Sequence, residues 1–276
     1  MIQEKRWKHS KTWFELAMVL DDILEHKRKE VEELKKRTPL AQLIEEAEND
    51  KGKRRSFKGA LSKGKTPRFI CELKKASPSE GLLRESFDVS QVAQEFQEAG
   101  ASAISVLTER HYFLGDPLFI KQTRLVTEIP ILRKDFIFDS YQIYETLLLG
   151  ADAFLLIVHL LSDAKLEEFL KIARSLKLDV LVEVHTKEEL DRAVQAGSEM
   201  IGINNRNLET LKTDLSVSER LASHIPKNVI TVVESGIDTR KDIERYERLG
   251  IHSFLIGTSL MKSKNIKQKI SELITN

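Results

Sequence analysis

The sequence predicts an α/β protein, a (β/α)8 (TIM) barrel that follows an N-terminal helical extension. Two observations favour this fold. From residue 69 onward, short apolar runs alternate with amphipathic segments of helix length, and eight such runs can be counted. The second observation is a repeat, in which a glycine ends a helical segment shortly before the next apolar run. The glycines are 50, 47 and 53 residues apart, at Gly100, Gly150, Gly197 and Gly250.

The predicted strands are the apolar runs, whose length and composition are typical of buried strands. They are Phe69–Lys74, Ala103–Leu107, Ile131–Lys134, Ala153–Val158, Val180–Val184, Met200–Ile203, Val229–Glu234 and Ser253–Ile256. One period of the glycine repeat holds two strand–helix units, so eight units close most simply into a barrel. An open doubly wound sheet is the alternative, but it would need a Gly-x-Gly-x-x-Gly loop after its first strand. The loop at residues 77–81, Ser-Pro-Ser-Glu-Gly, does not have this pattern.

The predicted helices of the barrel are the amphipathic segments that follow the strands. They are Val89–Glu98, Asp116–Thr127, Ser140–Leu149, Asp163–Leu176, Thr186–Ala196, Asp214–His224, Thr239–Leu249 and Ile266–Ile274.

Residues 1–66 are predicted to form the helical extension and residues 67–276 the barrel, as one domain overall. Apolar residues recur at helical spacing between Leu20 and Leu34. Thr38 is then expected to be an N-cap, with Pro39 at the first position of a second helix. The basic segment 50–58 is expected to be a solvated linker, or else to help attract an anionic substrate.

Composition and charge exclude several classes of protein. Across 276 residues, Lys plus Arg (44) nearly balance Asp plus Glu (43), which gives no indication of nucleic-acid or membrane binding. Cys71 is the single cysteine, so no intrachain disulfide can form, and its apolar surroundings predict a core residue. The most apolar segment, 147–161, is shorter than the ~20 residues of a membrane span. We expect a soluble, cytoplasmic protein.

Charged side chains stand at the predicted ends of several strands, where barrel enzymes place their chemistry. Glu72 and Lys74 are two residues apart and share one face of the first strand. Lys134 and Glu183 end the third and fifth strands, so we expect all four to face one cavity. Opposed charges of this kind can divide acid and base roles. The alternative is that they are solvated strand ends or structural ion pairs.

Two small-residue loops predict a phosphate site. Ser235-Gly236 follows the seventh strand and Gly257-Thr258 the eighth, and both are expected to open helices. Backbone N–H groups at such positions bind phosphate, and in barrels these two loops frequently do so. Plain turns are the alternative. The histidines at positions 111, 159 and 185 lack metal-ligand spacing, so no metal is expected.

A family resemblance combines these features. Seven stretches carry it, in chain order: Glu72–Ser79, Leu107–Phe113, Leu132–Phe136, Leu181–His185, Gly202–Leu208, Glu234–Ile237 and Ile256–Met261. Together they resemble indole-3-glycerol-phosphate synthase, a barrel enzyme of the tryptophan pathway. The helical extension is similar to the segment that lies over the barrel mouth in that family.

The resemblance implies a reaction and a set of catalytic residues. The substrate would be 1-(o-carboxyphenylamino)-1-deoxyribulose 5-phosphate, which loses carbon dioxide and water on ring closure to indole-3-glycerol phosphate, with no cofactor. Lys134 would protonate the developing alkoxide, and Lys74 would pair with the substrate carboxylate or act in the dehydration. Glu183 would stabilise positive charge or act as a base. Glu72, Asn204 and Ser235 complete the implied catalytic set.

The resemblance also implies the binding residues. Arg206 would bind the substrate carboxylate or hold the carboxylates of the protein. An apolar slot for the anthranilate ring would be made by Phe113, Phe136 and Leu208, for which core packing is the alternative. The phosphate would be held by Ser77, Gly236, Gly257 and Thr258, with Ser235. Other tryptophan-pathway enzymes are possible partners.

Two rival functions are weaker. Phosphoribosylanthranilate isomerase, another barrel enzyme that binds a phosphosugar, usually has a Cys or Asp base near strand one, but Cys71 faces away from Glu72. A non-catalytic barrel that binds a phosphometabolite would not need Lys134.

Overall fold

Eight parallel strands close into a barrel, which confirms the predicted fold. The computed structural model describes residues 13–62, 64 and 66–275. In it the strands neighbour one another in the order β1-β10-β9-β8-β7-β6-β5-β4 and close on themselves. Their bounds are β1 (Arg68–Leu73), β4 (Ala103–Leu107), β5 (Ile131–Lys134), β6 (Ala153–Ile157), β7 (Asp179–Val184), β8 (Met200–Asn204), β9 (Ile230–Glu234) and β10 (Ser253–Ile256). A two-stranded hairpin, β2 (Ala76–Ser77) with β3 (Gly81–Leu82), follows β1.

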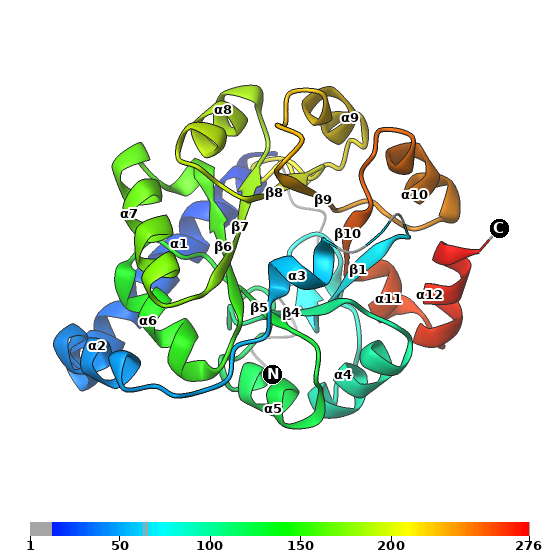
Figure 1. Ribbon diagram of the computed structural model, residues 1–276. Coiled ribbons are helices and arrows are strands. Elements are labelled where there is room, and N and C mark those ends of the chain that lie inside the picture. Colours follow the sequence, from blue (N-terminus) through cyan, green and yellow to red (C-terminus); the bar gives the residue numbers. More distant parts are fainter. Residues whose placement is uncertain (1–12, 63, 65, 276) are drawn as a thin grey trace.

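Helices surround the barrel on the outside, as Figure 1 shows. They are α4 (Val89–Glu98), α5 (Leu118–Val126), α6 (Ser140–Leu149), α7 (Asp163–Ser175), α8 (Lys187–Gln195), α9 (Ser216–Ala222), α10 (Arg240–Glu247) and α12 (Ile266–Ile274). A short helix, α11 (Thr258–Lys262), precedes α12, and a 3-10 turn, Val158–Leu160, follows β6. The repeat glycines behave as predicted, since Gly150 caps α6 in the left-handed conformation with φ of 89°.

A short helix, α3 (Phe57–Leu61), closes the barrel at the N-terminal ends of its strands. The fully buried Phe57 packs with Ala103 and Met200, which begin two of the strands. The basic segment before it is tied to the same end, because the Arg55 guanidinium donates to the carbonyl oxygens of residues 127 and 129. This segment therefore lies opposite the end where the strands finish. The suggestion that it helps attract an anionic substrate gains no support from this position and stays a prediction.

The N-terminal segment contributes two further helices, α1 (Trp13–Arg37) and α2 (Leu40–Glu48). Pro39 occupies the N-cap position of α2 with no side-chain cap, so the predicted capping by Thr38 is wrong by one residue. Val31 and Leu43 pack with Tyr141 of α6 on the outside of the barrel. The other half of α1 crosses to the end opposite α3, and in Figure 1 α3 lies in front of the barrel and α1 behind it.

Two predictions from composition can also be compared with the fold. Cys71 is fully buried among the apolar side chains between the barrel and its helices, as predicted. Among the described helices, none combines the length and apolar character needed to cross a lipid bilayer.

Candidate active site

A cavity of about 390 Å³ opens at the end of the barrel where the strands finish. Its wall is made by strand ends, by the loops that follow them and by α1. The residues predicted from the sequence all line it: Glu72, Lys74, Ser77, Phe113, Lys134, Phe136, Glu183, Asn204, Arg206, Leu208, Ser235, Gly236, Gly257 and Thr258. The structure therefore brings the whole predicted set together, while the role of each residue stays a prediction.

Lys134 lies at the centre of the charged side of the cavity. It is the last residue of β5, and its Nζ lies 3.2 Å from Glu183 Oε2 on β7. The same Nζ lies 2.7 Å from Oε2 of Glu234, the last residue of β9. Both carboxylates are almost fully buried, so each needs the ammonium as a partner. Three strands that are distant in the sequence assemble this cluster.

The buried charges shift one another's pKa values. Burial alone would lower the pKa of Lys134, but the surrounding carboxylates raise it above its ordinary value. Burial also favours the neutral form of Glu183, yet Lys134 and His185 hold the pKa of that carboxyl well below its usual range. For Glu234 burial prevails over the attraction of Lys134 and raises the pKa to about 7. Two carboxyl groups on one lysine thus have pKa values shifted in opposite directions.

Glu234 was recognised from the sequence as the end of a strand but was given no role. Its Oε1 is buried and has no hydrogen-bond partner among the described residues. Gly202 on β8 makes room for it, because a Cβ atom at that position would overlap Oε1. The requirement for glycine at 202 is the sequence signal that could have pointed to this close approach.

His185 is a second residue to which sequence reasoning gave no role. Its Nε2 lies 3.3 Å from Glu183 Oε1, and its Nδ1 lies 3.3 Å from Glu189 on α8. Burial would lower the pKa of His185, but the two carboxylates raise it to about 9. The imidazolium therefore stands behind Glu183, outside the cavity, and keeps that carboxylate ionised.

Glu72 and Lys74 form the second ion pair of the cavity. Lys74 Nζ lies 2.8 Å from Glu72 Oε2, as the shared strand face predicts. Burial would raise the pKa of Glu72, but Lys74 and Lys134 hold it below its ordinary value. A Cβ atom at Gly257 would overlap the Glu72 carboxylate, so glycine is needed where β10 passes this pair.

Asn204 ends β8, and the loop after it carries Arg206 and Leu208. The Asn204 side-chain oxygen accepts a hydrogen bond from the backbone N–H of Arg206 at 3.0 Å. Asn204 also forms a hydrogen bond with Glu183 that lowers the pKa of the carboxyl. The guanidinium of Arg206 donates to the carbonyl oxygen of Leu211 at 2.9 Å, which holds it against its own loop.

The predicted phosphate residues all line the cavity. Ser235 and Gly236 both have left-handed backbone, with φ of 65° and 84°, a strained conformation for serine that is typical of functional turns. Gly257 precedes α11, as predicted. The expectation that Ser235-Gly236 opens a helix is wrong, because α10 begins only at Arg240. The Ser77 hydroxyl lies opposite on the β2–β3 hairpin and accepts the N–H of Glu80 at 3.3 Å.

The remaining wall is apolar. Phe113 and Phe136 lie with ring centroids 6.3 Å apart, and Leu208 packs in the same cluster. Helix α1 contributes side chains that the sequence did not predict for the site, Val19, Leu20 and Ile23. Their helical spacing is visible in the sequence, and the family resemblance implies that the extension lies over the barrel mouth, but neither shows which of its side chains reach the cavity.

Comparisons with known proteins agree on one family. A family model described as indole-3-glycerol phosphate synthase matches residues 20–273. An indole-3-glycerol phosphate synthase from Legionella pneumophila (strain Paris) is 46% identical over 94% of this chain and 99% of its own length. One from Thermoanaerobacter pseudethanolicus is 46% identical over 93% of this chain and 97% of its own length. A thiamine phosphate pyrophosphorylase structure from Pyrococcus furiosus, at 15% identity, covers 76% of this chain and 94% of that chain with a TM-score of 0.55, and shares the fold alone.

Proposed function

The chain belongs to the indole-3-glycerol phosphate synthase family of carboxy-lyases in tryptophan biosynthesis, and from this premise we propose which residues carry the reaction. The reaction converts 1-(o-carboxyphenylamino)-1-deoxyribulose 5-phosphate to indole-3-glycerol phosphate. The observation that carries the proposal is the ammonium group of Lys134, held between Glu183 and Glu234 in the cavity.

Lys134 is the general acid of the ring closure. When the anilino ring carbon attacks the ketone, a C–C bond forms and the ketone oxygen becomes an alkoxide that needs a proton. The ammonium of Lys134 donates that proton, and its charge stabilises the oxygen as it develops. The neutral amine left behind is 2.7 Å from Glu234. The pKa of that carboxyl is raised to about 7, so its protonated form can return a proton to Lys134.

Glu183 stabilises the positive charge that develops on the substrate in the same reaction. Attack by the anilino ring places positive charge on the ring and its nitrogen until carbon dioxide leaves. An ionised Glu183 stabilises that charge and can accept the proton that the nitrogen loses in the dehydration. His185 supports this role by keeping the carboxylate ionised. Asn204 orients Glu183 through their hydrogen bond.

Lys74 and Glu72 complete the catalytic group. Lys74 pairs with the substrate carboxylate before it leaves, or protonates the departing hydroxyl in the dehydration. Glu72 holds Lys74 by the 2.8 Å ion pair and orients the substrate hydroxyls. Ser235 approaches the reacting part of the substrate from its strained turn.

The substrate lies across the cavity from an apolar to a polar end. The anthranilate ring occupies the slot between the two phenylalanines and Leu208. Arg206 binds the carboxylate of the ring. The phosphate is held by backbone N–H groups and hydroxyls at Ser77, Ser235, Gly236, Gly257 and Thr258. A cytoplasmic location and association with other tryptophan-pathway enzymes are further predictions.

Turnover without any added metal or cofactor tests the proposal. The purified chain is mixed with the substrate, and indole absorbance and fluorescence are followed, with calorimetry in parallel. We expect a rise in both signals. Binding without a rise would contradict the catalytic roles and favour a phosphometabolite-binding barrel.

The isomerase alternative has no support at Cys71, because its thiol is fully buried outside the cavity and burial raises its pKa.

A further inference from the structure

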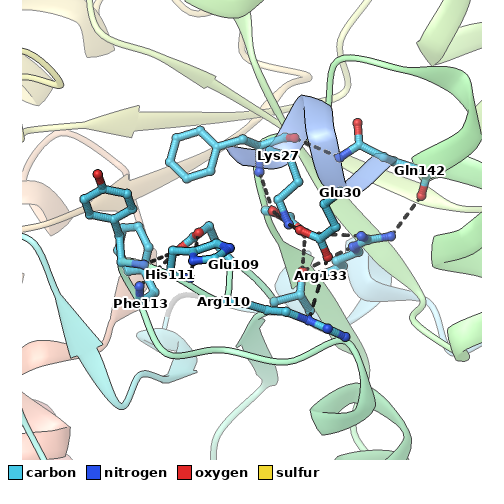
Figure 2. A network of polar contacts seen from close by, with 12 residues as sticks. Lys27, Glu30, Glu109, Arg110, His111, Phe113, Arg133 and Gln142 are labelled. Atoms are coloured by element: carbon cyan, nitrogen blue, oxygen red, sulfur yellow. Dashed lines mark hydrogen bonds and ion pairs between the residues drawn. The ribbon is translucent and has the colours of Figure 1, made fainter. Parts of the chain in front are cut away.

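A buried ion pair that the reaction does not use joins α1 to Asp135, the residue that follows β5. Lys27 on α1 is 2% exposed, and its Nζ lies 3.1 Å from Asp135 Oδ1 and 3.2 Å from Oδ2. Glu30, one turn along α1, lies 2.8 Å from the same Nζ. Figure 2 shows both side chains extending from the helix toward the strand. Burial would lower the pKa of Lys27, but the two carboxylates raise it, so the amine is charged.

Asp135 stands between two residues of the cavity, Lys134 and Phe136. Its Oδ2 accepts the Thr108 hydroxyl at 2.5 Å and an Arg133 N–H at 3.2 Å. Its Oδ1 accepts the backbone N–H of Phe136 at 2.9 Å. The carboxylate thus fixes the backbone on the C-terminal side of Lys134. We therefore expect a displacement of Asp135 to shift the backbone next to Lys134.

The network continues from Asp135 to the outer helices. The fully buried Arg133 donates to the Gln142 carbonyl oxygen at 3.0 Å, a contact drawn in Figure 2, and pairs with Glu145 at 2.7 Å. Both partners lie on α6, so β5 is held firmly on its outer side. Through its ion pair with Asp135, Lys27 connects α1 to this network of Asp135, Arg133 and α6.

The same face of α1 forms part of the cavity wall. Leu20 and Ile23 line the cavity and precede Lys27 by seven and four residues, a spacing that places all three on one side of a helix. The Lys27–Asp135 pair therefore sets the position of the apolar wall relative to Lys134.

The energetics argue against stability as the main role of this pair. Desolvating two charges costs several kcal/mol, and well-packed neutral replacements of buried ion pairs are often equally stable. An ion pair does impose one fixed geometry, which an apolar contact would not. Catalysis depends on such geometry, since a misplacement of about 1 Å can cost about a hundredfold in rate.

We propose that Lys27 and Asp135 are positioning residues, which hold the α1 wall of the cavity in place relative to Lys134. This inference rests on the proposed role of Lys134 as the acid. The pair acts on the reaction through the orientation of Lys134 and through the substrate contacts of α1.

The test compares two double variants of the same helix. Lys27→Met/Asp135→Asn removes the pair without leaving a buried charge alone. The control is Lys35→Met/Asp139→Asn, because Lys35 also joins α1 to the loop after β5, at 2.7 Å, but is part-exposed and contacts no cavity residue. We expect the first variant to lose about tenfold or more in kcat, with a raised KM. The control should stay within about twofold of wild type in both constants.

Urea unfolding of each variant separates positioning from folding. If the first variant is folded and keeps wild-type kcat and KM, the inference is wrong. It is also wrong if both double variants lose activity equally, because that would reflect docking of α1 in general. If the first variant does not fold, Asp135→Asn alone replaces it, because Lys27 then keeps Glu30 as its partner. We expect this single variant to lower kcat. A wild-type kcat would overturn the inference. A wild-type chain without turnover would refute the proposed function itself.

Discussion

At the scale of single residues, the site works by giving similar groups different charges. Glu183 and Glu234 contact the same ammonium, but the His185 imidazole lies beside Glu183, whereas Gly202 lies against the carboxyl of Glu234. The pKa of Glu183 is held well below its usual range, while that of Glu234 is raised to about 7.

His185→Gln tests the charge behind Glu183. A histidine whose pKa is raised to about 9 in the folded state contributes stability that is complete below about pH 6.5 and is lost as the pH rises through 9. The variant should therefore be less stable than wild type at pH 6, by a free energy of unfolding on the order of 3 kcal/mol. The difference should shrink by pH 9.5.

Urea unfolding at the two pH values provides the measurement, and His224→Gln, at an exposed position after α9, controls for the loss of a histidine. A difference between wild type and His185→Gln that does not change with pH would contradict an imidazolium at this position.

The sequence reveals the role of a residue when that role follows from its position in a strand. It does not reveal a role that depends on a contact between residues far apart in the chain. Lys74 and Lys134 could be placed in the cavity from strand periodicity and family resemblance. The role of Glu234 depends on 2.7 Å to a lysine one hundred residues away, which no local pattern encodes. His185 differs in this respect, because its partners Glu183 and Glu189 lie only two and four residues away in the sequence. That spacing is visible locally, but the sequence analysis considered His185 only as a metal ligand.

At the scale of secondary-structure elements, glycines decide how closely strands and charged side chains approach. Gly202 admits the Glu234 carboxylate between β8 and β9, and Gly257 admits the Glu72–Lys74 pair beside β10. Neither glycine has the positive φ of a turn glycine, so space rather than backbone conformation is the reason for them.

Gly202→Ala should displace Glu234 from Lys134. The added methyl overlaps the buried carboxylate, so we expect a loss of about 1–3 kcal/mol in the free energy of unfolding, and a lower kcat. Adding Glu234→Asp shortens the acid and should restore part of the stability. Chemical denaturation and steady-state kinetics measure both effects. If Gly202→Ala matches wild type in stability and kcat, the close packing described for Glu234 is wrong.

Most elements could be predicted because apolar runs ended by charges or glycine mark strands well. The bounds of all eight strands agree with the prediction within one or two residues. The helix α3 was missed because five residues in a basic segment give no periodic signal, and its burial depends on Phe57 entering the barrel. The cap of α2 was misplaced because Pro39 itself occupies the N-cap position.

At the scale of the whole molecule, the two ends of the barrel have different tasks. The N-terminal ends of the strands are closed by α3 and its apolar residue Phe57, whereas the other end holds the cavity under α1. Contributions to stability and to catalysis are thereby separated along the barrel axis.

Phe57→Ala tests this separation. Removing a fully buried phenylalanine should cost about 3–5 kcal/mol in the free energy of unfolding. Activity of the folded fraction should stay near wild type, because the residue lies at the opposite end from Lys134. Urea denaturation and kinetics at low temperature measure the two quantities. A large loss of kcat in fully folded protein would mean that the ends are coupled.

The central claim is that Lys134 is the acid of the ring closure, and Lys134→Ala tests it most directly. The measurement is kcat for indole formation together with substrate affinity by calorimetry, since general acids contribute about 10²–10⁴-fold in rate. We predict that kcat falls by at least about 10²-fold, while the fold and most of the substrate affinity remain. A variant that folds, binds substrate and turns over at nearly the wild-type rate would contradict the account.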